Sequence, residues 1–221
     1  MRVPEESIGG GDFDLIGRIE LGLLLLADLR PGDTVVDLGC GTGRLAAHLI
    51  PFLSAGRYVG IEISRNMLRD AARRTAGLGG GCVVEWKHQV RPRFELSPSS
   101  VDLLCAFSVF THMEAEDTYR YFESALAVVR PGGKLVFSCL PLSLPGARKI
   151  FLDSAQQDLQ ARWSGVRNFV TSEAMMESLA AMAGWQVVRW YRGDQPVVAV
   201  DGRPEPQALG QSTCVLQRPA R

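Results

Sequence analysis

The sequence lacks an excess of either charge, a long apolar run and a secretory leader pattern. Its 24 basic residues balance 24 acidic ones, so no net field attracts nucleic acid or an anionic membrane surface. The longest apolar run, residues 21–26, is far too short to cross a bilayer. The first residues also lack the basic start and the small-residue cleavage site of a signal peptide. We therefore expect neither nucleic acid nor a membrane as a partner.

Cysteines are few, odd in number and never spaced as CxxC. Such scattered residues argue against a zinc site and against a disulfide framework, and they favour a reducing compartment. We expect no metal and a cytoplasmic location. The five cysteines are Cys40, Cys82, Cys105, Cys139 and Cys214.

Apolar β-branched runs alternate with helical patterns along the 221 residues, a pattern typical of βαβ units and a mostly parallel sheet. This length suits one α/β domain, residues 1–221. The predicted strands are residues 34–38, 58–63, 83–87, 101–107, 134–139, 186–191 and 213–217. The predicted helices are residues 13–29, 43–52, 65–76, 115–129 and 172–183.

One stretch, residues 35–46, combines a buried strand, a glycine-rich turn and the start of a helix. Alternate glycines at Gly39, Gly41 and Gly43 remove the Cβ atoms that would keep a ligand away from the backbone. The helix that follows offers oriented N–H donors. The pattern therefore predicts that something polar binds against this turn.

The spacing of the glycines in this turn distinguishes two classes of nucleotide-binding protein. A nicotinamide fingerprint ends in a small residue that lets helix and strand pack closely, and here Arg44 takes that place. The GxGxG turn, with Asp37 before it, resembles the first motif of class I S-adenosylmethionine (SAM)-dependent methyltransferases. The resemblance implies that Gly39, Cys40, Gly41 and Gly43 approach the methionyl part of SAM and that Asp37 helps to hold its ammonium group.

An acidic residue, Glu62, ends the second predicted strand about 20 residues after the turn. That spacing brings a carboxylate to a nucleoside site, where two oxygens accept from both ribose hydroxyls. The next residues resemble the family's adenine-covering stretch, which makes Ile63 and Met67 candidates. For Met67, an ordinary place in the helix core is an equal alternative.

Two further stretches complete the expected cofactor site. Gln89 stands where the family usually has an acid that accepts from the adenine amino group, and the N–H of Val90 would meet the ring. A solvent-facing loop is the alternative there. Ala106 and Phe107 end a strand that resembles the family's fourth, which would pass beside the sulfonium and the transferred methyl group.

The resemblance implies a seven-stranded, mostly parallel sheet with helices on both faces and a C-terminal antiparallel hairpin. It also allows residues 1–30 to fold over the cofactor. Segments 140–170 and 193–210 are longer than connections require, so we expect them on the acceptor side. Aromatic residues in or near these segments suggest an apolar or aromatic small-molecule acceptor, although each of them alone is more often a core residue: Phe110, Phe151, Trp163 and Phe169.

The expected activity is methyl transfer from SAM to a small molecule by in-line displacement, with S-adenosylhomocysteine (SAH) as the product. His112, just past the fourth strand, is the candidate base for an acceptor that must lose a proton, and a helix-entry role is its alternative. Two other functions remain open, namely binding of SAM or SAH without turnover and a nicotinamide-dependent oxidoreductase. The residues assign no oligomeric state.

Overall fold

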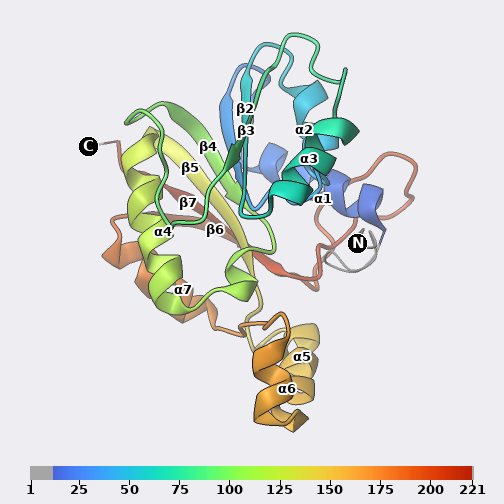
Figure 1. The fold of residues 1–221 in the computed structure, drawn as a ribbon, viewed down its shortest axis with the longest axis vertical. Coiled ribbons are helices and arrows are strands. Elements are labelled where there is room, and N and C mark those ends of the chain that lie inside the picture. Colours follow the sequence, from blue (N-terminus) through green and yellow to red (C-terminus); the bar gives the residue numbers. More distant parts are fainter. Residues whose placement is uncertain (1–11, 221) are drawn as a thin grey trace.

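A seven-stranded sheet forms the centre of the protein, whose computed structural model describes residues 12–220. The strand order is β3-β2-β1-β4-β5-β7-β6, and only β7 runs antiparallel to its neighbours (Figure 1). This arrangement confirms the predicted mostly parallel sheet with a C-terminal antiparallel hairpin. The strands are β1 (Thr34–Leu38), β2 (Arg57–Glu62), β3 (Val83–His88), β4 (Val101–Ala106), β5 (Val129–Cys139), β6 (Gln186–Tyr191) and β7 (Ser212–Gln217).

Four of the helices, α1, α3, α6 and α7, begin where a side chain accepts from a free N–H group of the first turn. Asp12 accepts from Leu15 N at 3.1 Å, and Ser172 accepts from Met175 N at 3.1 Å. The helices are α1 (Phe13–Leu26), α2 (Ala46–Phe52), α3 (Arg65–Arg74), the 3₁₀ turn η2 (Phe110–His112), α4 (Ala115–Val128), α5 (Pro145–Gln156), α6 (Leu159–Ser164) and α7 (Glu173–Met182).

The sheet carries a hydrophobic core on each face. Residues of α1 and α2 pack on one face, and residues of α4 and α7 pack on the other (Figure 1). Adjacent positions on β1 show the alternation, since Val35 belongs to the first core and Val36 to the second. Burial on both faces explains why the strands are apolar runs and not alternating patterns.

A bulge lies inside β5, just before the residues predicted to form this strand. Val101 pairs with Val129 and Leu103 pairs with Lys134, so residues 130–133 have no partner in the register with β4. Gly132 has a φ of +76°, which an L side chain rarely adopts. The strand therefore begins five residues earlier than predicted.

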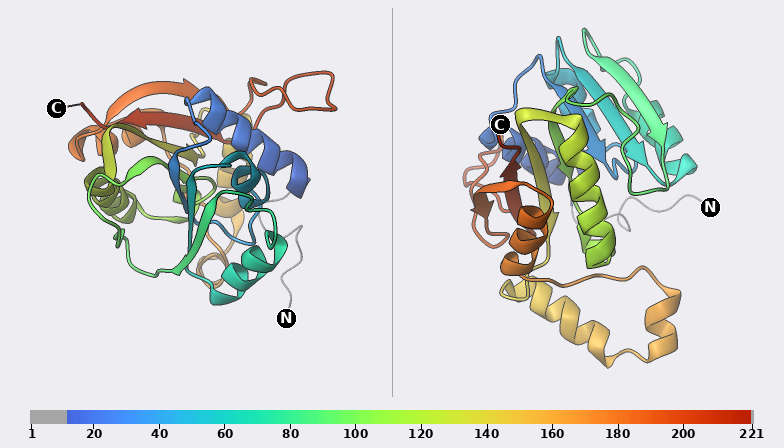
Figure 2. Two further views of the ribbon diagram at one scale, coloured as in Figure 1. Left: turned by 90° about the horizontal axis from the view of Figure 1, so that it is seen from above. Right: turned by 90° about the vertical axis from the view of Figure 1, so that its left-hand side faces the viewer.

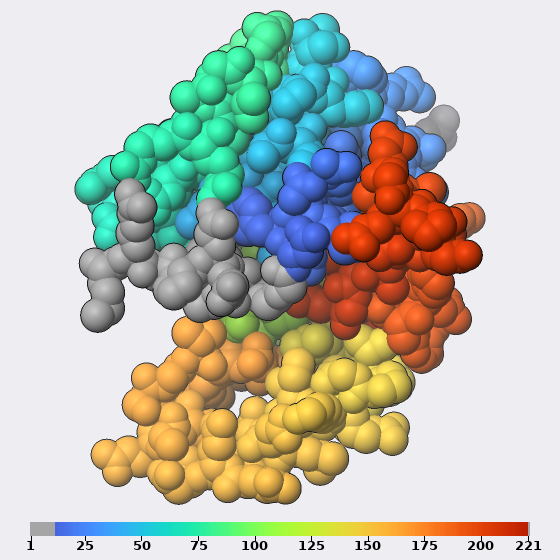
Figure 3. Space-filling view, turned by 90° about the vertical axis from the view of Figure 1, so that its right-hand side faces the viewer, coloured from blue at the N-terminus to red at the C-terminus, as the bar shows by residue number. Residues whose placement is uncertain are grey.

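Residues 140–170 form a helical arm that contains α5 and α6, which the sequence analysis did not predict. The arm follows the carboxyl end of β5 and stands apart from the sheet (Figures 1, 2 and 3). Hydrogen bonds from Leu142 N to Thr171 O and from Thr171 N to Leu140 O, each 2.9 Å, close its base. The arm thus lies at the edge of the sheet where the parallel strands end.

The loop of residues 193–210 packs against α1. Val198 and Val200 are buried, and a Cβ on Gly22 of α1 would lie 2.1 Å from a methyl of Val198. Arg203 pairs with Asp12 at 3.6 Å. Among residues 12–220, no helix has the length and apolar character needed to span a membrane.

Candidate functional site

The glycine turn lies at the carboxyl end of β1 and is fixed by backbone hydrogen bonds to β2. Gly39 N and Cys40 N both donate to Ile61 O, at 2.8 and 3.1 Å. Gly39, Gly41 and Gly43 have φ values of +70°, +55° and +88°. Each glycine therefore occupies the left-handed region, which the sequence pattern anticipated.

The three glycines differ in what surrounds them. A Cβ on Gly43 would lie 3.2 Å from the Cα of Ala71 on α3, and a Cβ on Gly39 would lie 2.5 Å from a Val109 methyl. At Gly41 the nearest such atom, Gly39 O, is 3.9 Å away. Two glycines thus permit close packing, whereas Gly41 leaves open space above the turn.

Glu62 faces this open space from the end of β2. One carboxylate oxygen accepts from Gly41 N at 3.1 Å, and the other accepts from Ser64 N at 2.9 Å. A carboxylate oxygen has two lone pairs, so each oxygen keeps the capacity to accept a second hydrogen bond. The backbone thereby fixes the carboxylate while leaving one acceptor site on each oxygen for a ligand.

Two apolar side chains near Glu62 are exposed. Ile63 follows it with 62% of its surface exposed, and Val90, just beyond the end of β3, is 61% exposed. Met67, on the first turn of α3, is partly exposed. Isolated exposed apolar residues are ordinary, but these flank a fixed carboxylate at the edge of the sheet, as a flat ligand would require.

Gln89 lies beside them, with an amide whose orientation is set. Its Nε2 donates to Arg91 O at 3.1 Å, and its own backbone N donates to Glu62 O at 3.2 Å. The side-chain oxygen therefore remains as the acceptor at this position. That is the role that the sequence analysis expects of it.

Asp37 is buried on the α1 side of the sheet. Its carboxylate accepts from Tyr58 Oη at 2.7 Å and lies 3.7 Å from the thiol of Cys105. Burial raises the pKa of Asp37 to about 7, against the lowering effect of the Tyr58 hydrogen bond. In this structure the side chain therefore interacts with Tyr58 below the turn.

A buried ion pair connects the glycine turn to α1. Arg44 Nε lies 3.3 Å from Glu20 Oε2, and Arg44 Nη2 lies 2.5 Å from Oε1. Burial raises the pKa of Glu20, while Arg44 acts in the opposite direction. Gly17 lets α1 approach, since a Cβ there would lie 2.6 Å from Arg44 O. Sequence reasoning used Arg44 only to reject a nicotinamide fingerprint and missed this pairing.

The remaining predicted cofactor residues are buried near the ends of their strands. Ala106 is the last residue of β4, and Phe107 directly follows it. The thiol of Cys40 is buried too, which raises its pKa well above the usual range. The structure thus brings Cys40, Ala106 and Phe107 to the same edge of the sheet as Gly39 and Glu62.

His112, at the end of η2, contacts the returning end of the helical arm. Its Nδ1 lies 2.9 Å from Arg167 O, and Phe169 N donates to Thr111 O at 2.7 Å. A carbonyl oxygen can only accept, so Nδ1 donates in this contact, and in the neutral ring Nε2 is the nitrogen with the lone pair. The arm therefore fixes the ring with its basic nitrogen available.

Arg167 is in turn held by two aromatic rings. Its guanidinium carbon lies 4.2 Å from the centre of the Trp163 ring and 4.7 Å from that of Phe169. A hollow of about 390 Å³ opens beside it. Its lining combines the start of α4 with the arm: His112, Met113, Glu114, Asp117, Gly165, Val166, Arg167 and Phe169.

Two aromatic residues expected near an acceptor differ from each other in exposure. Phe110 packs in the core against Phe122 and Phe137, with ring centres 5.3 and 5.6 Å apart, so the core alternative holds for it and the acceptor-side interpretation does not. Phe151 on α5 is exposed. Periodicity could not separate the two because both residues occur in mixed apolar stretches.

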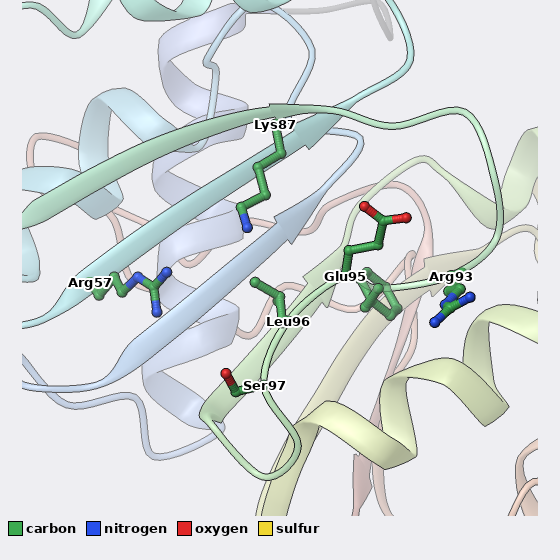
Figure 4. Close-up of a pocket in the computed structure, with 7 residues that line it drawn as sticks. Arg57, Lys87, Arg93, Glu95, Leu96 and Ser97 are labelled. Carbon is green, nitrogen blue, oxygen red and sulfur yellow. The ribbon is translucent and has the colours of Figure 1, made fainter.

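A second hollow, of about 510 Å³, lies on the α4 side of β2 and β3, where residues 89–100 form no helix (Figure 4). Arg57 and Lys87 point toward it from the sheet, and Leu96 and Ser97 border it from the loop (Figure 4). Arg57 already pairs with Glu85 at 2.6 Å. The glycine turn and Glu62 are not among its lining residues.

Comparison with known proteins indicates the family that this site resembles. Residues 36–135, which run from β1 to β5, match the family model described as a methyltransferase domain. This match covers less than half of the 221 residues. Together with the fold, which the chain shares with solved SAM-dependent methyltransferases, it confirms the resemblance that the glycine turn indicated.

Three similar proteins illustrate the family relationship. A malonyl-[acyl-carrier protein] O-methyltransferase of Methylococcus capsulatus is 27% identical over 215 residues, covering 90% of this chain and 71% of that protein. An uncharacterised transposon protein of Streptomyces fradiae is 36% identical over 110 residues, covering 49% of this chain and 30% of that protein. The magnesium protoporphyrin IX methyltransferase of Synechocystis, solved with bound SAH, has a TM-score of 0.67 at 17% identity, covering 96% of this chain and 90% of that chain.

The aligned part of this chain thus spans less than a third of the Streptomyces protein and less than three quarters of the Methylococcus enzyme. The likeness to the Synechocystis structure concerns the fold. The site itself fits SAM in two respects. Gly41 leaves room for a ligand against the backbone, and Glu62 keeps an acceptor site on each oxygen.

Proposed function

We propose that this protein transfers a methyl group from SAM to a small-molecule acceptor and releases SAH. The observation that carries the proposal is the Glu62 carboxylate, which Gly41 N and Ser64 N hold beside an open glycine turn. When bound, SAM supplies an electrophilic methyl group on a positively charged sulfur. The match of residues 36–135 to a methyltransferase domain supports the same activity.

The protein's own residues bind and orient this cofactor. Glu62 accepts from the two ribose hydroxyls, and Ile63, Met67 and Val90 cover the adenine. Gln89 accepts from the adenine amino group through the oxygen that its contact with Arg91 O leaves available. Backbone groups of the turn from Gly39 to Gly43 bind the methionyl part, with Asp37 toward its ammonium group and Ala106 and Phe107 beside the methyl.

The acceptor binds between the end of β4 and the helical arm. Support comes from the hollow beside His112 and from the exposed apolar side chains of the arm, which would contact an apolar or aromatic molecule. His112 Nε2 takes a proton from an acceptor that must lose one. The exposed apolar residues of the arm are Leu142, Phe151, Leu152, Leu159, Trp163 and Val166.

A free small molecule is our proposal for the acceptor, although the Methylococcus relative is named for a malonyl group carried on a protein. Exposed apolar surface in the arm supports a compact apolar ligand. We infer a cytoplasmic location, which the five free cysteines support because a reducing compartment keeps thiols unpaired.

The first test is calorimetric titration of the purified protein with SAM, SAH and NADH. We expect SAM and SAH to bind and NADH to give no heat of binding. Formation of SAH with a panel of small acceptors then separates an enzyme from a protein that binds SAM without turnover. Binding of NADH alone, or of none of the three, would overturn the proposal.

A further inference from the structure

Ser108 has an unusual backbone conformation next to the proposed methyl-transfer position. It is the second residue after β4, and its φ of +57° lies in the left-handed region. A serine there costs free energy that glycine would avoid, and such outliers cluster at functional sites. Contacts with the surrounding protein must therefore hold Ser108 in this conformation.

Three polar residues from neighbouring strands form a closed ring of hydrogen bonds. Ser108 N donates to Ser138 Oγ at 2.8 Å, and Ser138 Oγ donates to Gln211 Oε1 at 2.6 Å. Gln211 Nε2 returns to donate to Ser108 Oγ at 3.0 Å. Ser138 lies on β5 and is fully buried, while Gln211 directly precedes β7. The ring fixes both the backbone and the hydroxyl oxygen of Ser108.

One hydrogen-bonding group of this ring, the Ser108 O–H, has no partner among residues 12–220. The Ser108 oxygen accepts from Gln211, but within residues 12–220 its own O–H donates to no protein atom. The side chain is partly exposed, so a ligand can reach it. The ring thus presents a single oriented hydroxyl donor at the edge of the sheet.

We propose that the Ser108 hydroxyl donates a hydrogen bond to an oxygen atom of the methyl acceptor and that Ser138 and Gln211 are its positioning residues. The proposal rests on the proposed methyltransferase function and defines its acceptor as an oxygen nucleophile. Ser108 is not one of the residues that the resemblance to the family's cofactor motifs assigns.

The choice of oxygen follows from lone pairs. An amine nitrogen has one lone pair, which it needs for attack, so it cannot also accept from Ser108. A phenolate, alcohol or carboxylate oxygen has a second lone pair that can accept while the first attacks. The oxygen forms its bond to the methyl carbon as the carbon–sulfur bond breaks and sulfur keeps that electron pair. A proton, where the acceptor carries one, leaves to His112 Nε2 or to water.

An isosteric substitution tests the direction of the hydrogen bonds in the ring. In Gln211→Glu, both side-chain oxygens accept, so Ser108 must turn its O–H toward residue 211 and loses the donor for the acceptor. Ser108→Gly and Ser108→Ala remove the hydroxyl outright, and the glycine variant also relieves the backbone strain. Gln186→Glu is the matched control because it adds the same charge at an exposed position on the edge strand β6, outside the ring and outside the acceptor-side segments.

The measurement is SAH formation with phenols, carboxylic acids and primary amines at saturating SAM. We expect turnover of oxygen acceptors, with kcat/KM reduced about 10- to 100-fold in Ser108→Gly, Ser108→Ala and Gln211→Glu, the scale of losing a hydrogen bond to a charged group. The Kd for SAM should stay within about two-fold in all variants, as should every parameter of Gln186→Glu. Turnover of amines only, or variants with wild-type kcat/KM, would overturn the inference.

A crystal structure of the SAH complex provides a readout that needs no acceptor. We expect an ordered water or ligand oxygen about 2.6–3.2 Å from Ser108 Oγ, on the side of the SAH sulfur. A Ser108 hydroxyl that instead donates to the protein or to SAH would overturn the inference while leaving the proposed function intact. Wild-type protein that binds neither SAM nor SAH would overturn both.

Discussion

Tyr58 Oη lies 2.7 Å from Asp37 Oδ2, and both side chains are buried beneath the glycine turn. The two residues belong to the neighbouring strands β2 and β1. Burial raises the pKa of Asp37 to about 7, so its carboxyl group changes charge near neutral pH. This contact links the stability of the protein to pH at the base of the proposed cofactor site.

Asp37 should make the protein less stable as the pH rises from about 4 to about 7. The folded-state pKa of about 7 exceeds the unfolded value of about 4, so the folded state retains a proton that the unfolded chain has lost. The contribution of Asp37 to the free energy of unfolding is fully present below the unfolded-state pKa of about 4, and it is lost as the pH rises through the folded-state pKa of about 7.

The substitution Asp37→Asn tests this expectation because the amide keeps the size of the side chain but does not titrate. Urea unfolding of both proteins between pH 4 and 8 gives the difference in free energy. We expect wild type to lose a few kcal/mol relative to Asp37→Asn over this range, on the order of the linkage between the two pKa values. A constant difference would show that Asp37 does not titrate there.

Breaking the Glu20–Arg44 pair should cost much more stability than breaking an exposed pair. Arg44→Ala leaves Glu20 buried without this partner, and we expect a loss of about 3–5 kcal/mol in the free energy of unfolding. The control is Arg18→Ala, whose ion pair with Asp14 is solvent-exposed and should contribute about 0–1 kcal/mol. Equal losses in the two variants would contradict the proposed link between α1 and the turn.

Replacing Glu62 should weaken SAM binding. Glu62→Ala removes both acceptor oxygens, and calorimetry should show a loss of about 1–3 kcal/mol in binding free energy. Glu62→Gln keeps the size and one oxygen and should lose less. The exposed Glu116→Ala on α4 serves as the control and should bind like wild type. An unchanged affinity in a folded Glu62→Ala protein would remove Glu62 from the site.

His112→Asn should slow transfer to an acceptor that must lose a proton. Its amide nitrogen can still donate toward Arg167 O, but the basic nitrogen is gone. We expect kcat to fall about 10²- to 10⁴-fold and its pH dependence to flatten, with the Kd for SAM unchanged. His48→Asn, in α2, is the control. A variant with the wild-type rate and pH profile would leave His112 a purely structural role.

The sheet was largely predictable because its signals are local. The apolar runs around Val35, Val59 and Leu104 marked buried strands, and the glycines at 39, 41 and 43 marked a turn that needs positive φ. The helical arm was missed because its helices bury little surface: α6 has no buried residue, and α5 buries only Ala147. Amphipathic periodicity indicates a helix only where one face packs against a core.

The local amino-acid pattern was enough to predict the strand–turn–helix motif, the resemblance to methyltransferases and the residues at the strand ends, because these features depend on residues that are neighbours along the chain. Contacts between residues far apart in the sequence became visible only in the three-dimensional fold. It pairs Arg44 with Glu20, sets His112 against Arg167 and closes the ring of Ser108, Ser138 and Gln211. These contacts join segments 24 to 103 residues apart, and such separations arise from strand order and helix packing.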